Sequence, residues 1–337
     1  DVEAKSKKSK SRAKHVISKP YNPRNASILI EGNTGMVLMQ DNADWTLYPA
    51  SLTKLMTLLL VFEALDSGRL TLQSPVYISA RANKMPPSRL GVDVGETITV
   101  DQAIRALVTK SANNIAVAVA EKIAGSEENF ALRMNLKARE IGMEHSHFVN
   151  ASGLHNVGQY SSARDMARLG QYIYKNMPRY YPYFALKEFY FKGAVSQNHN
   201  HLMKEYQGMD GMKTGYITQS GFNLVASAKR NGVRLIGVVI GGKTASSRNA
   251  QMRQLLDKGF EKMRHVSVSD ARGLTHQNQG QNQRPVLQKP EALAVAPPTA
   301  PDNTPITSAL AGSGTWEIQL GAYQDRVSTD QAIYSAL

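Results

Sequence analysis

The sequence has 337 residues, with 40 lysines and arginines against 27 aspartates and glutamates, a net charge of +13 and no cysteine. Domains usually contain about 100–200 residues, so this length predicts one large or two modest domains. The absence of cysteine excludes disulfides, thiolate metal sites and a cysteine nucleophile. The longest apolar stretch, Leu55–Leu65, is far shorter than the ~20 residues of a membrane-spanning helix.

Nearly half of the net charge lies near the start of the chain. Residues 1–24 contain eight lysines and arginines and two acidic residues, a balance of +6. Such a Ser/Lys-rich run is typical of a solvated, disordered arm, which we assign to residues 1–25. Nucleic-acid binding is the sharper alternative, but only Tyr21 is available for base stacking and no recognition motif follows. We therefore expect no nucleic-acid partner; anionic lipid or wall polymer suits the arm at least as well.

Three further regions follow the arm. Residues 26–264 are dense in periodic apolar pattern and predict the folded catalytic domain. Residues 265–313 have linker composition, because a Gln/Asn run over 277–283 is followed by six of the 14 prolines. In residues 314–337 apolar alternation returns, but this piece is too short to fold alone. We interpret it as the start of a further domain.

The folded region has strand signals at both of its ends. The elements predicted from periodicity, turn residues and caps are, in chain order, strands 27–31 and 36–40 around a turn at 32–35, helices 51–66, 100–124 and 127–141, strands 222–230 and 233–241, and a helix over 251–263. Asn231 and Gly232 between the last two strands are the strongest short-range hairpin signal. This order predicts an α+β fold: an antiparallel sheet of chain-distant segments flanked by helices, with a mostly helical subdomain.

Ser51 and Lys54 form the first candidate site, because their spacing places both on one face of the predicted helix. A serine hydroxyl becomes a strong nucleophile only when a base removes its proton. An amine is such a base only if burial or a neighbouring positive charge lowers its pKa. The apolar run that starts at Leu55 predicts this burial. The alternative is a serine cap followed by a surface lysine; the same spacing also occurs at Ser11–Lys14 in the arm.

Two further motifs contain polar groups suited to the same chemistry. Ser111 and Asn113, in or just after the second helix, offer a hydroxyl for proton relay and an amide for holding a peptide bond. Lys213 and Thr214, on a strand with a bare Gly215, suit the binding of an anionic group that approaches the backbone closely. The alternatives are an interrupted helix with polar residues facing water, and a turn with an exposed lysine.

The three motifs occur in the order typical of serine enzymes that form acyl-enzymes. With them, the chain resembles the serine D-alanyl-D-alanine carboxypeptidases, or low-molecular-mass penicillin-binding proteins, over about residues 26–260. The segments Pro49–Met56, Asn150–Leu154 and Ser161–Leu169 carry the resemblance as well. The resemblance implies a β-lactamase/transpeptidase-like fold for the catalytic domain.

The sequence departs from that family in three places. Asn114 stands where Asp or Gly usually follows the Ser-x-Asn motif, and Ile217 stands where Thr often follows Lys-Thr-Gly. Both bear on the fine shape of the pocket rather than on the bond-making groups. No apparent counterpart of the family's second, all-β domain follows Phe260, because the linker occupies that place.

The resemblance implies removal of the terminal D-alanine from peptidoglycan stem peptides. Ser51 would attack the carbonyl of the penultimate D-alanine and Lys54 would take its proton. Ser111 would then pass a proton to the leaving D-alanine, and water would hydrolyse the acyl-enzyme. β-Lactam antibiotics would acylate the same serine and be released slowly.

The resemblance also implies how the substrate is bound. Asn113 would hold the substrate amide. Lys213 and Thr214 would bind the terminal carboxylate, with Arg248 as a helper. The oxyanion would lie between the backbone N–H groups of the nucleophile and Tyr216.

The final segment gives a second resemblance. Residues 315–323 look like the first strand of a SPOR domain, and residues 331–337 would begin its first helix. Such domains bind glycan strands stripped of stem peptides, so a complete domain would add glycan strands as a partner. The chain begins with Asp1 rather than Met, which fits a removed signal peptide and a shortened sequence equally. We expect an exported, periplasmic protein associated with the cell wall.

Two histidine pairs, His145 with His147 and His199 with His201, would place both rings on one face of a strand. Glu144 adjoins the first pair, but no third ligand at metal-site spacing is evident. We expect surface or turn histidines, and neither a metal nor a cofactor.

Two other functions stay open. A serine β-lactamase would share the fold, but its commonest class activates the deacylating water with a carboxylate usually followed by a Leu-Asn pair, and this chain has no Leu-Asn dipeptide. A peptidoglycan-binding scaffold with a lapsed catalytic site is the other alternative. The residues that argue against it are Ser51, Lys54, Ser111, Asn113 and Lys213.

Overall fold

The computed structural model describes the backbone of residues 25–276 and the side chains of residues 25–264. The predicted basic arm up to residue 24, the linker from residue 277 onwards and the SPOR-like segment lie outside the described residues. The predictions made for them therefore stay predictions. Among residues 25–276, no helix combines the length and the apolar character needed to cross a membrane.

A five-stranded antiparallel sheet forms the centre of the fold, in the order β2-β1-β9-β8-β7. Its strands are β1 (Ala26–Glu31), β2 (Val37–Asp41), β7 (Met209–Ile217), β8 (Gly221–Arg230) and β9 (Val233–Gly242). β1 pairs with β9, beginning with Ala26 opposite Ile240, so segments from both ends of the domain are neighbours. The predicted sheet of chain-distant segments is confirmed. The predicted hairpin is confirmed as well, with positive φ at Asn231 and Gly232.

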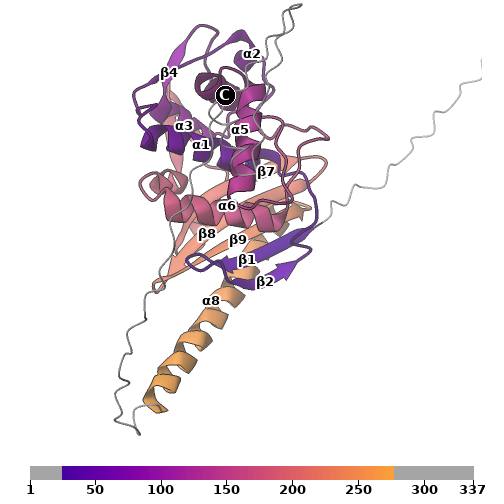
Figure 1. The fold of residues 1–337 in the computed structure, drawn as a ribbon, viewed down its shortest axis with the longest axis vertical. Helices are drawn as coiled ribbons and strands as arrows, with labels where there is room; N and C mark the ends of the chain where they lie inside the picture. Colours follow the sequence, from indigo (N-terminus) through magenta and orange to yellow (C-terminus); the bar gives the residue numbers. More distant parts are fainter. Residues whose placement is uncertain (1–24, 277–337) are drawn as a thin grey trace, which may run out of the picture. The chain divides into compact units, whose positions relative to one another are not determined.

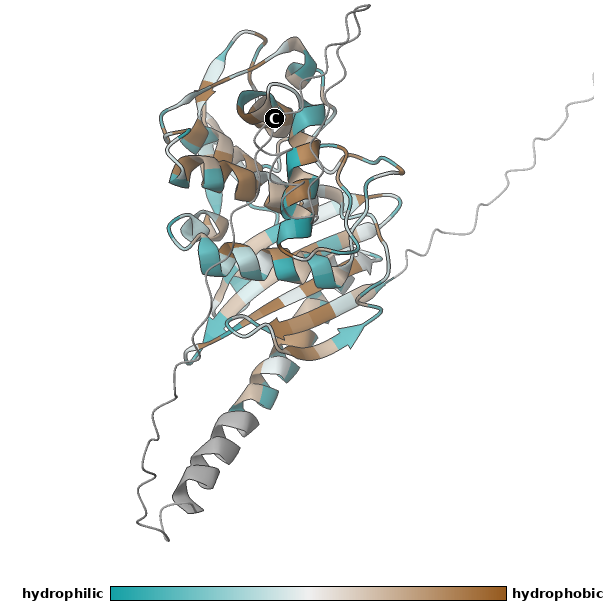
Figure 2. Cartoon of the chain, viewed as in Figure 1, coloured by the Kyte–Doolittle hydropathy of each residue, from teal (hydrophilic) through white to brown (hydrophobic). Residues whose placement is uncertain are grey.

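The two faces of the sheet are covered by different helices. Ile28 and Ile30 of β1 pack in the larger core with α6 (Ala163–Asn176), whereas Leu29 packs in a second core with α8 (Ala245–His276). Figure 1 shows α6 and α8 on opposite faces of the sheet, and Figure 2 shows hydrophobic stretches along its strands between hydrophilic turns. Because successive side chains of a strand point to opposite faces of the sheet, the apolar residues of β1 contribute to two different cores.

A largely helical subdomain is built around α1 (Lys54–Asp66), of whose 13 residues ten are buried. The predicted central helix is confirmed, with its first turn formed as the 3-10 helix η1 (Ala50–Thr53). The other elements are β3 (Pro75–Tyr77), α2 (Ala80–Asn83), β4 (Thr97–Thr99), α3 (Val100–Val108), α4 (Asn113–Ala124), α5 (Glu127–Glu140), η2 (Tyr181–Ala185), β5 (Glu188–Phe191), β6 (Ala194–Gln197) and α7 (Leu202–Glu205).

The prediction of one helix over residues 100–124 is wrong, because the chain breaks between α3 and α4. Ser111 has a φ of 58°, which a helix does not accommodate. The N–H of Asn113 donates to the carbonyl of Ser88 at 2.7 Å instead of to a carbonyl one turn earlier. The first N–H group of α4 is therefore satisfied by a loop distant in sequence.

The helix predicted over residues 251–263 is longer at both ends. Thr244 and Ser247 exchange backbone-to-hydroxyl hydrogen bonds of 3.0 Å, which cap a start at Ala245. The helix continues to His276, inside the segment predicted as linker. The prolines that favour an extended chain begin only at Pro285, so no residue before His276 stops the helix.

An ion pair between a buried arginine and a partly exposed aspartate ties β9 to the edge strand β7. Arg234 on β9 donates from two nitrogens to the two carboxylate oxygens of Asp210 on β7, both at 2.7 Å. Its guanidinium lies 4.4 Å and 5.0 Å from the ring centroids of Tyr174 and Tyr181. It also bonds to Ser227 on the intervening β8 at 2.6 Å. The pair thus holds the strand that contains the Lys-Thr-Gly motif.

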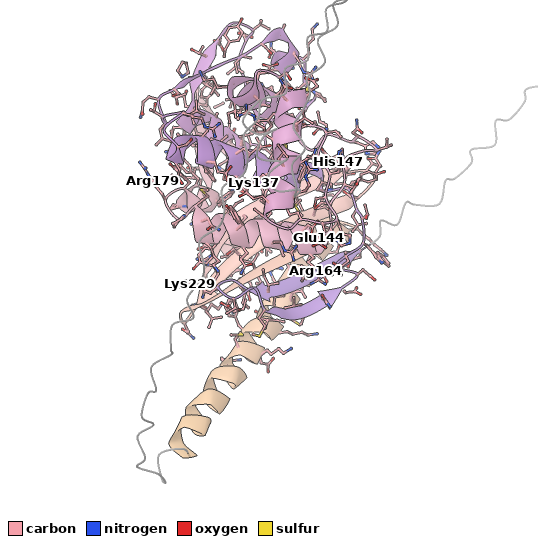
Figure 3. The ribbon with its side chains drawn as sticks, viewed as in Figure 1. Lys137, Glu144, His147, Arg164, Arg179 and Lys229 are labelled. Atoms are coloured by element: carbon pink, nitrogen blue, oxygen red, sulfur yellow. The ribbon has the colours of Figure 1, made fainter. Side chains whose placement is uncertain are left out.

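Replacing Asp210 by alanine should destabilise the fold by about 3–5 kcal/mol, because the buried Arg234 loses its counter-charge. The matched control is Asp44→Ala, which removes an exposed partner of Arg164 (Figure 3) and should cost at most about 1 kcal/mol. Urea unfolding at neutral pH, followed by circular dichroism, gives both free energies. Losses of equal size in the two variants would contradict the structural role of the pair.

Candidate active site

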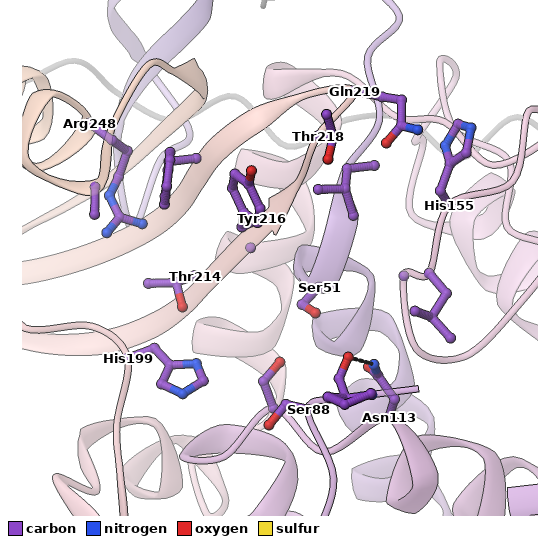
Figure 4. A pocket seen from close by; sticks show the side chains of 18 of the residues that line it. Ser51, Ser88, Asn113, His155, His199, Thr214, Tyr216, Thr218, Gln219 and Arg248 are labelled. Atoms are coloured by element: carbon purple, nitrogen blue, oxygen red, sulfur yellow. Dashed lines mark hydrogen bonds between the residues drawn. The ribbon is translucent and has the colours of Figure 1, made fainter. Parts of the chain in front are cut away.

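One pocket of 660 Å³ brings together residues from all three motifs. The predicted site residues that line it are Ser51, Ser111, Asn113, Thr214, Gly215, Tyr216 and Arg248. Lys54 and Lys213 lie behind its walls, with 0% and 1% of their surface exposed. Figure 4 shows Ser51 between Asn113 on one side and the strand with Thr214 and Tyr216 on the other. Segments far apart in the chain thus share one pocket.

Two glycines let distant backbone segments approach Ser51. A Cβ added to Gly215 would lie 3.1 Å from the carbonyl oxygen of Pro49 and 3.1 Å from the nitrogen of Ser51. A Cβ added to Gly153, which has a φ of +84°, would lie only 1.9 Å from the carbonyl oxygen of Ala50. A side chain at either position would push the neighbouring segment away from the serine.

The Lys54 amine is bonded at the base of the pocket. Its Nζ lies 3.1 Å from Ser51 Oγ, 2.8 Å from Asn113 Oδ1 and 2.5 Å from the carbonyl oxygen of Ser152. Burial, and after it the charge of Lys213, hold the pKa of Lys54 well below its usual value of 10.5. Because desolvation and a like charge both disfavour the ammonium ion, the neutral amine is promoted.

The hydrogen-bond partners determine where the N–H groups and the lone pair of this neutral amine point. A neutral amine has two N–H groups and one lone pair. The carbonyl of Ser152 can only accept, and so can Asn113 Oδ1, because the Nδ2 of the same amide donates to two proline carbonyls at 3.0 Å each. These two acceptors use both N–H groups. The lone pair of Lys54 is left for the hydroxyl of Ser51.

The carbonyl that meets Lys54 is held by the residues around it. The preceding residue, Ala151, is fixed at both of its backbone groups: Thr57 Oγ1 donates to its oxygen at 2.7 Å, and Glu127 accepts from its nitrogen at 3.0 Å. Thr57 and Glu127 are both buried. The helices α1 and α5 therefore fix the position of this acceptor.

Ser111 presents an unsatisfied hydroxyl to the pocket. The residue is 5% exposed, and its Oγ makes no hydrogen bond within the described part of the chain. Its loop is held by Ser88, which donates to the carbonyl of Lys110 at 2.8 Å. Asn114, where the sequence departs from the family pattern, pairs with both backbone groups of Leu90. Since buried hydroxyls usually have partners, this one is available to a group that enters the pocket.

Positive charge gathers at one end of the pocket. Lys213 donates to the carbonyl of Thr214 at 3.0 Å, and burial together with the charge of Arg248 lowers the pKa of Lys213 to about 7. Arg248 donates to the carbonyl of Asn223 at 2.7 Å, and burial lowers its own pKa to about 10. The described residues that line the pocket include no aspartate or glutamate. An anion bound here would favour the charged form of Lys213.

Three histidines of the pocket were not predicted as part of the site. His199 and His201, expected on the surface or in turns, are exposed as expected but also line the pocket. His155 lines it as well, with its ring edge-on to Tyr48 at 4.8 Å. His147 bonds to a loop carbonyl instead (Figure 3). The two-residue spacing of His199 and His201 was visible in the sequence. Whether their rings face a pocket depends on folding. Within residues 25–264 no group of histidines and acids is suited to hold a metal ion.

Comparison with known proteins identifies the family. The model of Peptidase S11, described as D-alanyl-D-alanine carboxypeptidase, matches residues 14–244. This chain belongs to the S11 peptidase family. Relatives include the D-alanyl-D-alanine carboxypeptidases DacF of Bacillus subtilis, 40% identical over 239 residues, and DacA of Escherichia coli, 38% identical over 240 residues. These matches cover 70% and 69% of this chain but only 61% and 60% of the relatives.

Solved structures of S11-like proteins have the same architecture. Penicillin-binding protein 5 from Haemophilus influenzae matches with a TM-score of 0.69 and 36% identity, covering 73% of each chain. Penicillin-binding protein D2 from Listeria monocytogenes, in its cefotaxime-bound form, matches with a TM-score of 0.65 and 29% identity, covering 72% of this chain and 99% of the other. The predicted β-lactamase/transpeptidase-like α+β fold is confirmed.

Replacing Gly153 by alanine should destabilise the fold by clearly more than the ~1–2 kcal/mol that left-handed backbone costs other residues. The excess arises because the new Cβ would overlap the carbonyl of Ala50. Gly125→Ala is the matched control, since Gly125 has a similar φ of +77° and open space around it. Urea unfolding gives the free energy of unfolding of both variants. Equal losses in the two variants would mean that the close approach at Gly153 is not required for stability.

Proposed function

We propose that this chain is a serine-type D-alanyl-D-alanine carboxypeptidase that removes the terminal D-alanine from peptidoglycan stem peptides. The observation that carries the proposal is the 3.1 Å hydrogen bond between Ser51 Oγ and the Nζ of a fully buried Lys54. Membership of the S11 family supports it. The names of the relatives, which are D-alanyl-D-alanine carboxypeptidases, support it further.

In the proposed reaction, Ser51 Oγ attacks the carbonyl carbon of the penultimate D-alanine while its proton moves to Lys54 Nζ. The negative oxygen of the tetrahedral intermediate lies between the backbone N–H groups of Ser51 and Tyr216. The C–N bond then breaks, and Ser111 gives its hydroxyl proton to the leaving amine while it receives the proton that Lys54 took from Ser51. Water attacks the resulting ester, releases the shortened peptide as an acid and restores the serine hydroxyl.

The remaining site residues are proposed to hold the substrate. Lys213, Thr214 and Arg248 bind the terminal carboxylate at the cationic end of the pocket. Asn113 orients Lys54 through its oxygen. For Asn113 also to hold the substrate amide, as the family resemblance implies, its Nδ2 must exchange a hydrogen bond with one of two proline carbonyls.

β-Lactams are proposed as covalent inhibitors. Their strained ring amide would be attacked by the same serine, and the ring carboxylate would occupy the same cationic end. The Listeria relative is described in cefotaxime-bound and ampicillin-bound forms, which supports this proposal.

Location and the glycan partner are proposed from the sequence. Relatives that act as D-alanyl-D-alanine carboxypeptidases support an exported, periplasmic protein that works on the cell wall. Residues 314–337, outside the described residues, resemble the start of a SPOR domain. We propose that a complete domain there would bind glycan strands stripped of stem peptides and so bring the enzyme to its substrate.

Two assays test the catalytic proposal together. The full chain should release D-alanine from an acylated peptide ending in D-Ala-D-Ala, and penicillin should add its mass to the peptide that contains Ser51. Ser51→Ala should lose both activities, because no other group takes over the attack. Ser11→Ala, in the chance S-x-x-K of the arm, is the control and should keep both. Penicillin attachment that survives Ser51→Ala would reject the nucleophile.

The rate of acylation by penicillin should fall at acidic pH, because Lys54 must be neutral to accept the proton. Since the charge of Lys213 lowers the pKa of Lys54, Lys213→Gln should raise that pKa and move the acid limb of the rate profile to higher pH. Lys229→Gln, an exposed lysine (Figure 3), should leave the limb in place. Stopped-flow acylation rates measure the profile. A rate that is flat from about pH 5 to about pH 9 would exclude a lysine base.

A further inference from the structure

His199 occupies one end of the pocket. It lines the pocket together with Thr214 and Ser88. In Figure 4 its ring points inward beside these two residues, at the opposite end from His155 and Gln219. This is also the end where Thr214 leads to Arg248, the proposed site of the terminal carboxylate.

The backbone on both sides of His199 is held by buried asparagines. Asn198 donates from its side chain to the carbonyl of Leu186 at 2.8 Å, and its side-chain oxygen accepts from the N–H of Asn200 at 2.8 Å. Asn200 in turn donates to the carbonyl of Gly211 on β7 at 3.1 Å. Both asparagines are at least 95% buried. These bonds fix the segment to β7, so the backbone from which the His199 side chain enters the pocket has a defined place.

The surroundings disfavour a positive charge on the ring. Burial against the pocket, and then the charges of Lys213 and Lys110, lower the pKa of His199 to about 4. The ring is therefore neutral near pH 7. A neutral, flat ring on a segment that is held on both sides serves as a wall rather than as a further binding charge.

The leaving residue must lie against this wall if the proposed function holds. In that function the scissile bond lies at Ser51 and the terminal carboxylate lies at Thr214 and Arg248, so the side chain of the terminal residue falls between them. We propose that the His199 ring closes this subsite and restricts the leaving residue to a small side chain such as that of D-alanine. A larger side chain would overlap the ring, and the ring cannot retreat with its backbone, because Asn198 and Asn200 hold the segment.

The test compares two leaving residues on the full chain. The ratio of kcat/KM for an acyl-D-Ala-D-Ala peptide to that for the matching acyl-D-Ala-D-Leu peptide is measured from the released D-amino acid. In His199→Ala this ratio should fall by about tenfold or more, because the added space admits the larger side chain. His199→Phe, which keeps a flat ring of similar size, should retain the preference for D-alanine. His155→Ala, at the other end of the pocket, should leave the ratio unchanged.

The possible outcomes distinguish the proposed role of the His199 ring from the proposed carboxypeptidase function. Absence of D-alanine release by the unmodified chain would reject the proposed function itself. Release with an unchanged ratio in His199→Ala would overturn the wall while leaving the function intact. If His199→Phe lowered the ratio as much as His199→Ala, the proposed role of the ring would also be rejected, because a ring of similar size would then not preserve the preference for D-alanine. Attachment of penicillin at Ser51 in each variant shows that the pocket remains folded.

Discussion

The structure depends on keeping one lysine amine out of water beside a serine hydroxyl. The hydrogen-bond partners of Lys54 are a hydroxyl, a side-chain amide and a backbone carbonyl, all neutral. They satisfy the amine's hydrogen bonds without the charge of a carboxylate, so burial shifts the equilibrium to the neutral form. Each partner comes from a different segment: η1, the start of α4 and the chain near Ser152. These segments converge on one atom, the Nζ of Lys54.

The serine side of this arrangement requires backbone segments to lie unusually close. Gly215 brings the edge strand β7 against the segment that begins η1, and Gly153 brings a loop against the other side. An edge strand has only one neighbour, so its position needs additional support. The ion pair between Asp210 and Arg234 supplies it from β9, across β8. The precision of the site therefore rests on contacts outside the pocket.

Neighbouring positive charges lower the pKa values of the two lysines of the site. The charge of Arg248 contributes to lowering the pKa of Lys213, and the charge of Lys213 contributes to lowering that of Lys54. In the proposed reaction an incoming anion restores the charge of Lys213, whereas Lys54 bonds only to neutral groups. The surroundings thus support the proposal that one lysine binds an anion and the other acts as a base.

Local signals in the sequence determined the sheet, the central helix and the three motifs. Alternation, a turn pair such as Asn231-Gly232 and an apolar run depend on neighbouring residues, so they can be read from a single chain. The sequence left an interrupted helix at Ser111 only as an alternative, because the loop around the distant Ser88 that bonds to this segment is brought there by folding. The direction of His199 likewise depends on buried asparagines that bond to other segments. Whether Lys54 is neutral was decided only by tertiary structure, since desolvation and the approach of another charge exist only once the chain has packed.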